Sequence, residues 1–223
     1  MLDLRKVDRR GFTLIEIVIA VAIVAIFAAA ISPMVFRHLE DAKISKAQNE
    51  SEVLATAILG YYKDVGKWPF TDANGPSGNG IARVISSDVV PTGEGPGAPA
   101  SADNWGDYGN TKRLGDYLFY NNADNDSNPN GNRANQNNQD WPTTGANAWR
   151  GPYVSDYEIT DPWGSAYVVN ARYFPGGGGN VTNRHKVFVL SAGPNGVWDT
   201  AFADGETEEI LGDDIGTLVT IRN

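Results

Sequence analysis

The chain contains no cysteine and only two histidines among its 223 residues. Without cysteine it can form no disulfide, no thiolate metal site and no catalytic thiol. Basic residues are also scarce relative to acidic ones, and the net charge of -9 argues against nucleic-acid binding by phosphate neutralisation. The sequence lacks the short motifs of serine hydrolases, zinc peptidases and phosphate-binding loops. These absences predict that the protein is not an enzyme.

Charged side chains are absent from residues 17–36, a run of 20 residues. As a helix this run would be about 30 Å long, enough to cross the hydrocarbon core of a bilayer. Four basic side chains precede it, at Arg5, Lys6, Arg9 and Arg10. Basic residues flank membrane spans on the cytoplasmic side, so the pattern predicts a membrane helix whose N-terminus stays in the cytoplasm.

Two features distinguish this segment from a cleaved signal peptide, although Ala28–Ala30 resembles a small-residue cleavage site. Glu16 lies inside the apolar block, where a carboxylate requires a partner. Beyond the span, apolar residues continue at spacings of three and four, which predicts a helix from Phe12 to about Asp64. These apolar residues are Leu54, Ala57, Ile58, Tyr61 and Val65. The second half, residues 37–66, is therefore expected to be an amphipathic stem that ends at Gly66.

The sequence Arg-Arg-Gly-Phe-Thr-Leu-Ile-Glu at residues 9–16, followed by the apolar run and Pro33, resembles the processing site of type IV pilins and type II secretion pseudopilins. The resemblance implies that residues 1–11 are a leader removed by prepilin peptidase after Gly11. It also implies that Phe12 is then N-methylated and that residues 12–36 form the transmembrane and assembly helix. Glu16 would pair with the N-terminal amine of a neighbouring subunit, which offsets the burial of both charges. Pro33 would loosen the helix during packing.

The same resemblance implies a structural subunit that polymerises with itself and with minor pilins or pseudopilins. Its other partners would be the assembly platform and a separate ATPase. The protein would cross the inner membrane once, with the N-terminus inside and the globular domain in the periplasm. It would then join a filament in the periplasm or at the cell surface. The alternative is a surface adhesin or enzyme domain, anchored or secreted by an ordinary signal sequence.

Residues 67–223 are predicted to form a β-rich domain, which makes the whole chain α+β. Short β-branched or aromatic segments at 167–173, 186–190 and 217–221 predict strands, and the glycine-rich loop 176–179 indicates antiparallel pairing of the first two. Trp163 and Tyr167 are expected to fill the interface between sheet and stem helix. An Asn- and Gly-rich insertion at 121–148 is expected to be an exposed loop. The segment Asp-Pro-Trp-Gly-Ser-Ala-Tyr at 161–167 is similar to a motif of the major pseudopilin, the G subunit.

An acidic loop spans residues 191–215, and seven carboxylates lie between Asp199 and Asp214 with no lysine or arginine among them. Ca²⁺ prefers carboxylate and carbonyl oxygens in flexible loops, so the loop is a candidate calcium site. The resemblance supports this because major pseudopilins bind calcium in the corresponding loop. It implies a ligand set of Leu190, Asn195, Asp199, Asp213 and Asp214, with Asn195 standing where the family has an aspartate. The alternative is a solvated acidic loop without an ion.

Overall fold

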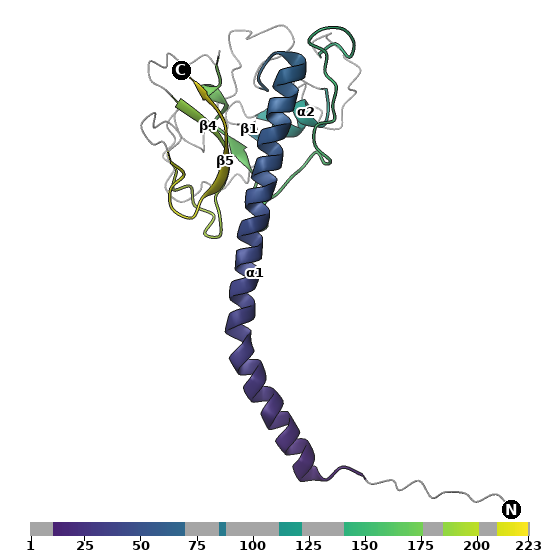
Figure 1. Cartoon of the computed structure of the whole chain (residues 1–223), viewed down its shortest axis with the longest axis vertical. Coiled ribbons are helices and arrows are strands. Elements are labelled where there is room, and N and C mark those ends of the chain that lie inside the picture. The colour runs from purple at the N-terminus through teal and green to yellow at the C-terminus, as the bar shows by residue number, and fades with distance from the viewer. Residues whose placement is uncertain are drawn as a thin grey trace, which may run out of the picture. The chain divides into compact units, whose positions relative to one another are not determined.

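The computed structural model describes residues 11–69, 85–87, 112–121, 141–175, 185–200 and 209–222 (Figure 1). The chain forms two compact units, residues 1–42 and 43–223. Residues 1–10 of the predicted leader lie outside the described residues. So do most of the predicted insertion, at 122–140, and residues 201–208 of the acidic loop.

The first unit consists of the start of α1, a helix of 52 residues that runs from Leu14 to Val65. The predicted long N-terminal helix is therefore confirmed. Every residue from 11 to 39 is exposed, and the apolar side chains cover all sides of the helix. Within α1 an 18-residue window has a mean hydropathy of 3.0 and no buried residue, so the helix is long and apolar enough to cross a membrane.

In the second unit, α1 buries one stripe of its surface against the globular domain. The stripe consists of Ala47, Ser51, Leu54, Ala55, Ala57, Ile58, Tyr61 and Val65. It includes all five positions predicted from the apolar spacing. The helix ends where Gly66 adopts a left-handed φ of 75° and its N–H donates to the carbonyl of Tyr62 at 2.7 Å. This is the glycine C-cap expected from the sequence.

Five short strands form one sheet in the order β2-β1-β3-β4-β5. They are β1 (Ile85–Ser86), β2 (Lys112–Arg113), β3 (Val168–Val169), β4 (His185–Ser191) and β5 (Ile215–Arg222). The β1–β2 pair is parallel, whereas β1–β3, β3–β4 and β4–β5 are antiparallel. A short helix, α2 (Leu114–Leu118), follows β2. Figure 1 shows β5 beside the second half of α1, where the hydroxyls of Ser51 and Thr217 lie 2.7 Å apart, so the domain is α+β as predicted.

The strand predicted at 167–173 is wrong beyond Val169, because Ala171–Tyr173 form a 3₁₀ helix. Asn170 ends the strand by replacing backbone pairing with its side chain. Its Nδ2 donates to the carbonyl of Lys186 at 2.9 Å, and its Oδ1 accepts the N–H of Phe188 at 2.9 Å. Asn side chains compete with ladder hydrogen bonds in this way. The predicted antiparallel pairing of the segment with β4 is confirmed.

Tyr167 fills the interface between helix and sheet as predicted. It is fully buried, and its hydroxyl donates to Oε2 of Glu50 at 2.8 Å. Trp163 is only half-buried, so the prediction that it fills the same interface is wrong. The Trp163 ring lies at the rim, where Nζ of Lys43 sits 6.0 Å from the ring centroid.

Candidate functional site

The residues that begin α1 form a capping box around Glu16. The Glu16 Oε2 atom accepts the backbone N–H of Thr13 at 2.8 Å and the Thr13 hydroxyl at 2.7 Å. In return, the backbone N–H of Glu16 lies 3.3 Å from Oγ1 of Thr13. The first N–H groups of a helix have no partner within the helix, and this arrangement satisfies two of them.

The Thr13 contribution was not anticipated from the sequence, although Thr-Leu-Ile-Glu at residues 13–16 fits the capping-box pattern. Both bonds to Thr13 use Oε2, and Oε1 of Glu16 makes no hydrogen bond within the described part of the chain. The exposed carboxylate therefore caps its own helix and keeps one oxygen available.

The other predicted processing and assembly residues surround this cap. Gly11 and Phe12 precede the first helical residue, and the Phe12 side chain is 85% exposed. Pro33 lies inside α1, which continues through it. A proline supplies no N–H to the preceding turn, and nearby the Ser32 hydroxyl donates to the carbonyl of Ala28 at 2.7 Å.

The segment 161–167 forms a turn that is fixed by the buried carboxylate of Asp161. Oδ1 of Asp161 accepts the N–H groups of Trp163 at 3.0 Å and Ser165 at 2.8 Å. Oδ2 accepts the hydroxyl of Ser191, the last residue of β4, at 2.5 Å. Gly164 completes the turn with a φ of 92°, which favours glycine. The aspartate of this motif therefore attaches the turn to the start of the acidic loop.

Two pairs of the predicted calcium ligands are brought together in that loop. Near its start, the N–H of Asn195 donates to Oδ2 of Asp213 at 3.1 Å, and the Asn195 amide also contacts Oδ1 of the same residue. Near its end, Oδ2 of Asp214 accepts the N–H groups of Asp199 at 3.1 Å and Thr200 at 2.7 Å. The hydrogen bond from the N–H of Thr200 was not predicted.

Asp214 is the most enclosed carboxylate among the described residues of the loop. Its side chain is buried, and Oδ1 has no hydrogen-bond partner within the described residues. Burial raises the pKa of Asp214, and the neighbouring Asp199 carboxylate adds to the increase, while the bonds from Thr200 oppose it. An enclosed carboxylate oxygen without a donor is the kind of atom that a cation would satisfy.

Two glycines make the close approaches in the loop possible. Gly193 and Gly212 have left-handed φ values of 63° and 64°. A Cβ at Gly193 would overlap the carbonyl of Asp213, and one at Gly212 would overlap the carboxylate of Asp199. Glycine is needed where the chain combines positive φ with close contact.

Leu190 and the carboxylates do not form one coordination shell in this arrangement. Leu190 is fully buried inside β4, opposite Gly216 of β5. Among the described residues, no three Asp, Glu, His or Cys side chains are grouped to hold a metal ion. The structure thus brings together Asn195 with Asp213 and Asp199 with Asp214, as two separate pairs.

These features define an α+β protein with an exposed, membrane-compatible N-terminal helix and a capped glutamate near its start. Comparison with known proteins shows which families the chain resembles. Residues 7–32 match the family described as the prokaryotic N-terminal methylation motif. No solved structure shows significant similarity to the chain.

The curated relatives include pilins and a secretion protein. The fimbrial protein EcpC of Eikenella corrodens is 34% identical over 85 residues, which cover 38% of this chain and 53% of EcpC. The type IV major pilin protein PilE1 of Neisseria gonorrhoeae is 41% identical over 61 residues, or 27% of this chain and 37% of the pilin. The type II secretion system core protein G of Pseudomonas aeruginosa is 29% identical over 111 residues, or 50% of this chain and 68% of that protein.

These matches agree with the resemblance to type IV pilins and pseudopilins that the sequence at residues 9–16 predicted. The chain spans about half or less of the length of the fimbrial relatives it matches first. The relatives are structural pilins and a pseudopilin rather than enzymes, in agreement with the prediction that the chain is not an enzyme.

Proposed function

We propose that the chain is a structural subunit of a type II secretion pseudopilus or a type IV pilus, and that it polymerises through α1. In this proposal, prepilin peptidase cuts after Gly11 and the new N-terminus at Phe12 is methylated. The observation that carries the proposal is the apolar surface of residues 12–36, which has no partner in the described chain and of which residues 12–32 lie within the matched methylation motif. Such a surface requires lipid or other helices around it.

Glu16 has a specific part in this assembly. While the subunit is in the membrane, Thr13 partly compensates the carboxylate through Oε2. In the filament, the methylated amine of Phe12 from a neighbouring copy would reach the remaining oxygen. An ion pair removed from water requires good geometry and further hydrogen bonds, which the threonine supplies.

The partners and location follow from this role. The subunit would assemble with itself and with minor pilins or pseudopilins, and it would depend on an assembly platform and a separate ATPase. It would cross the inner membrane once with its basic start in the cytoplasm and its globular domain in the periplasm. The filament would then lie in the periplasm or extend from the cell surface.

The test of processing is the intact mass and N-terminal sequence of the protein from its native membrane. The proposal expects a chain that begins at N-methylated Phe12. A start near Ile31 would indicate an ordinary signal peptide, and an uncut Met1 would indicate a plain anchor. Either result would favour the alternative of a surface adhesin or enzyme domain.

The test of assembly compares Glu16→Val with the matched variant Glu16→Gln. Glu16→Val should still insert and be processed but should give few filaments, because both the cap and the negative charge are lost. Glu16→Gln keeps an oxygen that can accept from Thr13 and removes only the charge. Equal loss in both variants would assign the effect to the charge, whereas a loss in Glu16→Val alone would assign it to the cap. Normal filament yield in Glu16→Val would contradict a role for this residue.

We also propose that the acidic loop binds Ca²⁺. The enclosed Oδ1 of Asp214 and the adjacent carboxylates of Asp199 and Asp213 support this, together with the oxygen ligands that calcium prefers. Asn195 and the carbonyl of Leu190 would complete the set. Because these groups form two pairs, binding would require them to move closer together.

Calcium binding is tested by the melting temperature of the purified full chain in detergent. For a site with a Kd of about 0.1–1 mM, free Ca²⁺ at about ten times the Kd should stabilise the fold by about 1.4 kcal/mol. This corresponds to an increase of about 3–6 °C for a domain of this size. Mg²⁺ at the same concentration is the control ion, and Asp214→Asn should abolish the increase. No increase with Ca²⁺ would favour the solvated loop.

A further inference from the structure

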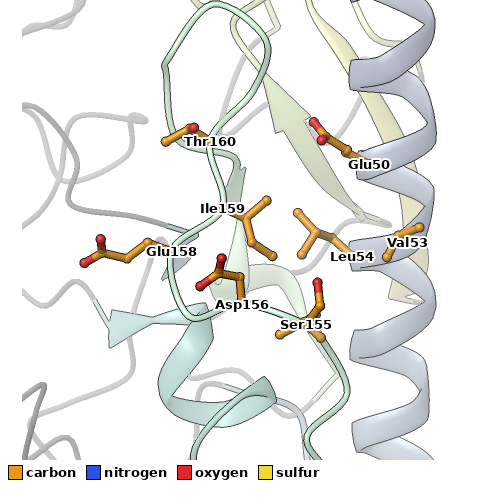
Figure 2. A pocket seen from close by; sticks show the side chains of 9 residues that line it. Glu50, Val53, Leu54, Ser155, Asp156, Glu158, Ile159 and Thr160 are labelled. Atoms are coloured by element: carbon orange, nitrogen blue, oxygen red, sulfur yellow. The ribbon is translucent and has the colours of Figure 1, made fainter.

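A groove of about 350 Å³ opens between α1 and the segment 154–160 (Figure 2). We call it the acidic groove. It is lined by Glu50, Val53, Leu54, Val154, Ser155, Asp156, Glu158, Ile159 and Thr160. Figure 2 shows Leu54 of α1 and Ile159 of the segment pointing toward one another across it. The groove is unrelated to the capped N-terminus and to the acidic loop.

The groove combines apolar walls with one carboxylate, that of Asp156, that forms no ion pair with the described residues. Leu54 and Val154 are buried beneath it, whereas Val53 is 60% exposed at its edge. Glu50 already contacts Nζ of Lys46 at 3.5 Å and the Tyr167 hydroxyl.

Asp156 is exposed, and among the described residues its carboxylate accepts one hydrogen bond, from the N–H of Tyr157 to Oδ1 at 2.8 Å. Glu158 points away from the helix and pairs with Arg113 at 3.2 Å. An apolar wall beside a free carboxylate fits a lysine or arginine, whose methylenes pack on apolar surface while the charge meets an acid.

The same chain carries unpaired basic side chains at the end of α1. Lys63, Lys67 and Arg150 are exposed and make no ion pair within the described residues, and we call them the basic end. The Tyr153 hydroxyl connects Arg150 to the end of α1. It accepts the N–H of Arg150 and donates to Oδ2 of Asp64, both at 3.0 Å. Arg150 therefore lies beside the last turn of the helix, where positive charge is favoured.

The basic end cannot enter the acidic groove of its own chain. Lys63 follows Leu54, the last groove residue on α1, by nine positions on a continuous helix, which separates them by about 14 Å along the axis. A lysine side chain is far too short for this distance. Contact between the two surfaces thus requires a second copy, and joining two different surfaces produces a head-to-tail arrangement that can repeat without closing.

We propose that the acidic groove receives the basic end of a second copy of this chain. A lysine or arginine of that copy lies with its methylenes on Leu54 and Ile159 and its charge on Asp156. The inference rests on the proposed function, because it names a contact between the globular domains of subunits in one filament.

Cross-linking tests the contact directly, because the chain has no cysteine of its own. Copies with Asp156→Cys are coexpressed with copies that carry Lys63→Cys, Lys67→Cys or Arg150→Cys, together with the assembly machinery. At least one combination should give a disulfide-linked dimer under mild oxidation, since a disulfide requires Cα atoms within about 7 Å. Lys46→Cys is the matched control, an exposed lysine on the same helix away from the basic end, and should give none.

Charge reversal provides a second readout. Asp156→Lys should weaken the addition of a subunit roughly fivefold, the upper effect of one exposed charge pair. Combining Asp156→Lys with Lys63→Glu, Lys67→Glu or Arg150→Glu in the same chain should restore the addition of a subunit for at least one of the three. Asp156→Asn, which retains the acceptor for Tyr157, separates the charge from the local turn.

The outcomes distinguish the two proposals. If filaments form but no combination cross-links and Asp156→Lys assembles normally, the inference is wrong while the proposed function stands. A cross-link from Asp156→Cys to a different protein would mean that this protein, and not a second copy of the chain, occupies the groove. That result would also overturn the inference. If the unsubstituted chain forms no filament with the assembly machinery present, both proposals fail.

Discussion

Replacing Asp161 by alanine should destabilise the globular domain more than any change at an exposed aspartate. The carboxylate is buried and accepts three hydrogen bonds, from the N–H groups of Trp163 and Ser165 and from the hydroxyl of Ser191. Alanine leaves all three donors without their partner. The change therefore affects both the turn at 161–165 and its attachment to β4.

The expected loss of stability follows from these bonds. A hydrogen bond to a charged group contributes about 1.5–3 kcal/mol, and the effects of neighbouring bonds are not additive. Trp163 and Ser165 are only half-buried, so water can reach their N–H groups in part. We expect the free energy of unfolding to fall by about 3–5 kcal/mol, which lowers the melting temperature by roughly 6–20 °C.

The assay is thermal and urea unfolding of the full chain in detergent, followed by tryptophan fluorescence and near-ultraviolet circular dichroism. Asp161→Asn should lose less, about 1–2 kcal/mol, because it keeps the Oδ1 acceptor and the Ser191 hydroxyl can reverse its direction. Asp156→Ala is the control, since that exposed side chain bonds only to the next N–H and should change stability by about 0.5 kcal/mol or less. The reasoning would be refuted if Asp161→Ala and Asp156→Ala differed by less than about 1 kcal/mol.

Two further predictions concern pH and the acidic loop. Burial raises the pKa of Tyr153 and of Tyr157 to about 12, with the carboxylates of Asp64 and Asp116 adding to the two increases. The fold thus favours the neutral phenols, so the contribution of these two tyrosines to stability should be fully present below about pH 10 and be lost as the pH rises to about 12. The double variant Tyr153→Phe and Tyr157→Phe should show a smaller fall in alkaline melting experiments, and an unchanged fall would contradict these shifts. Gly212→Ala should destabilise the fold by at least about 1–3 kcal/mol, because it combines a left-handed φ with overlap of a neighbouring carboxylate. Gly145→Ala is the control, because Gly145 has a φ of 92° but open space around it, so the substitution measures the cost of the positive φ alone.

Patterns that repeat along the chain predicted much of the architecture. The uncharged run at 17–36 and the apolar spacing from Leu54 to Val65 placed α1 almost to its ends, because a helix repeats every 3.6 residues. Gly66 marked the end of the helix for a local reason, its tolerance of positive φ. The methylation motif was recognised from eight adjacent residues, and it required no knowledge of the fold.

Contacts between segments that are distant in the sequence were harder to predict. Nothing near Asn170 in the sequence shows that its side chain will bond to β4 and end β3. Nor does the acidic loop reveal that Asp214 will accept N–H groups from Asp199 and Thr200, fifteen and fourteen positions earlier. Such pairings depend on how the strands bring the two ends of the loop together. The Thr13 cap, by contrast, could have been predicted, because Thr13 and Glu16 have the spacing of a capping box.

The two ends of the acidic loop are held by protein contacts that require no ion. At the start, Ser191 binds Asp161 and its Oγ also accepts the N–H of Gly193 at 3.1 Å. At the end, Asp214 accepts two N–H groups. An ion would therefore act on a loop whose ends are already in place, and would mainly relieve the repulsion between carboxylates and satisfy Oδ1 of Asp214. Removal of calcium should accordingly cost less stability than loss of the Asp161 carboxylate, and the reverse order would mean that the ion, rather than the turn at 161–165, organises this side of the domain.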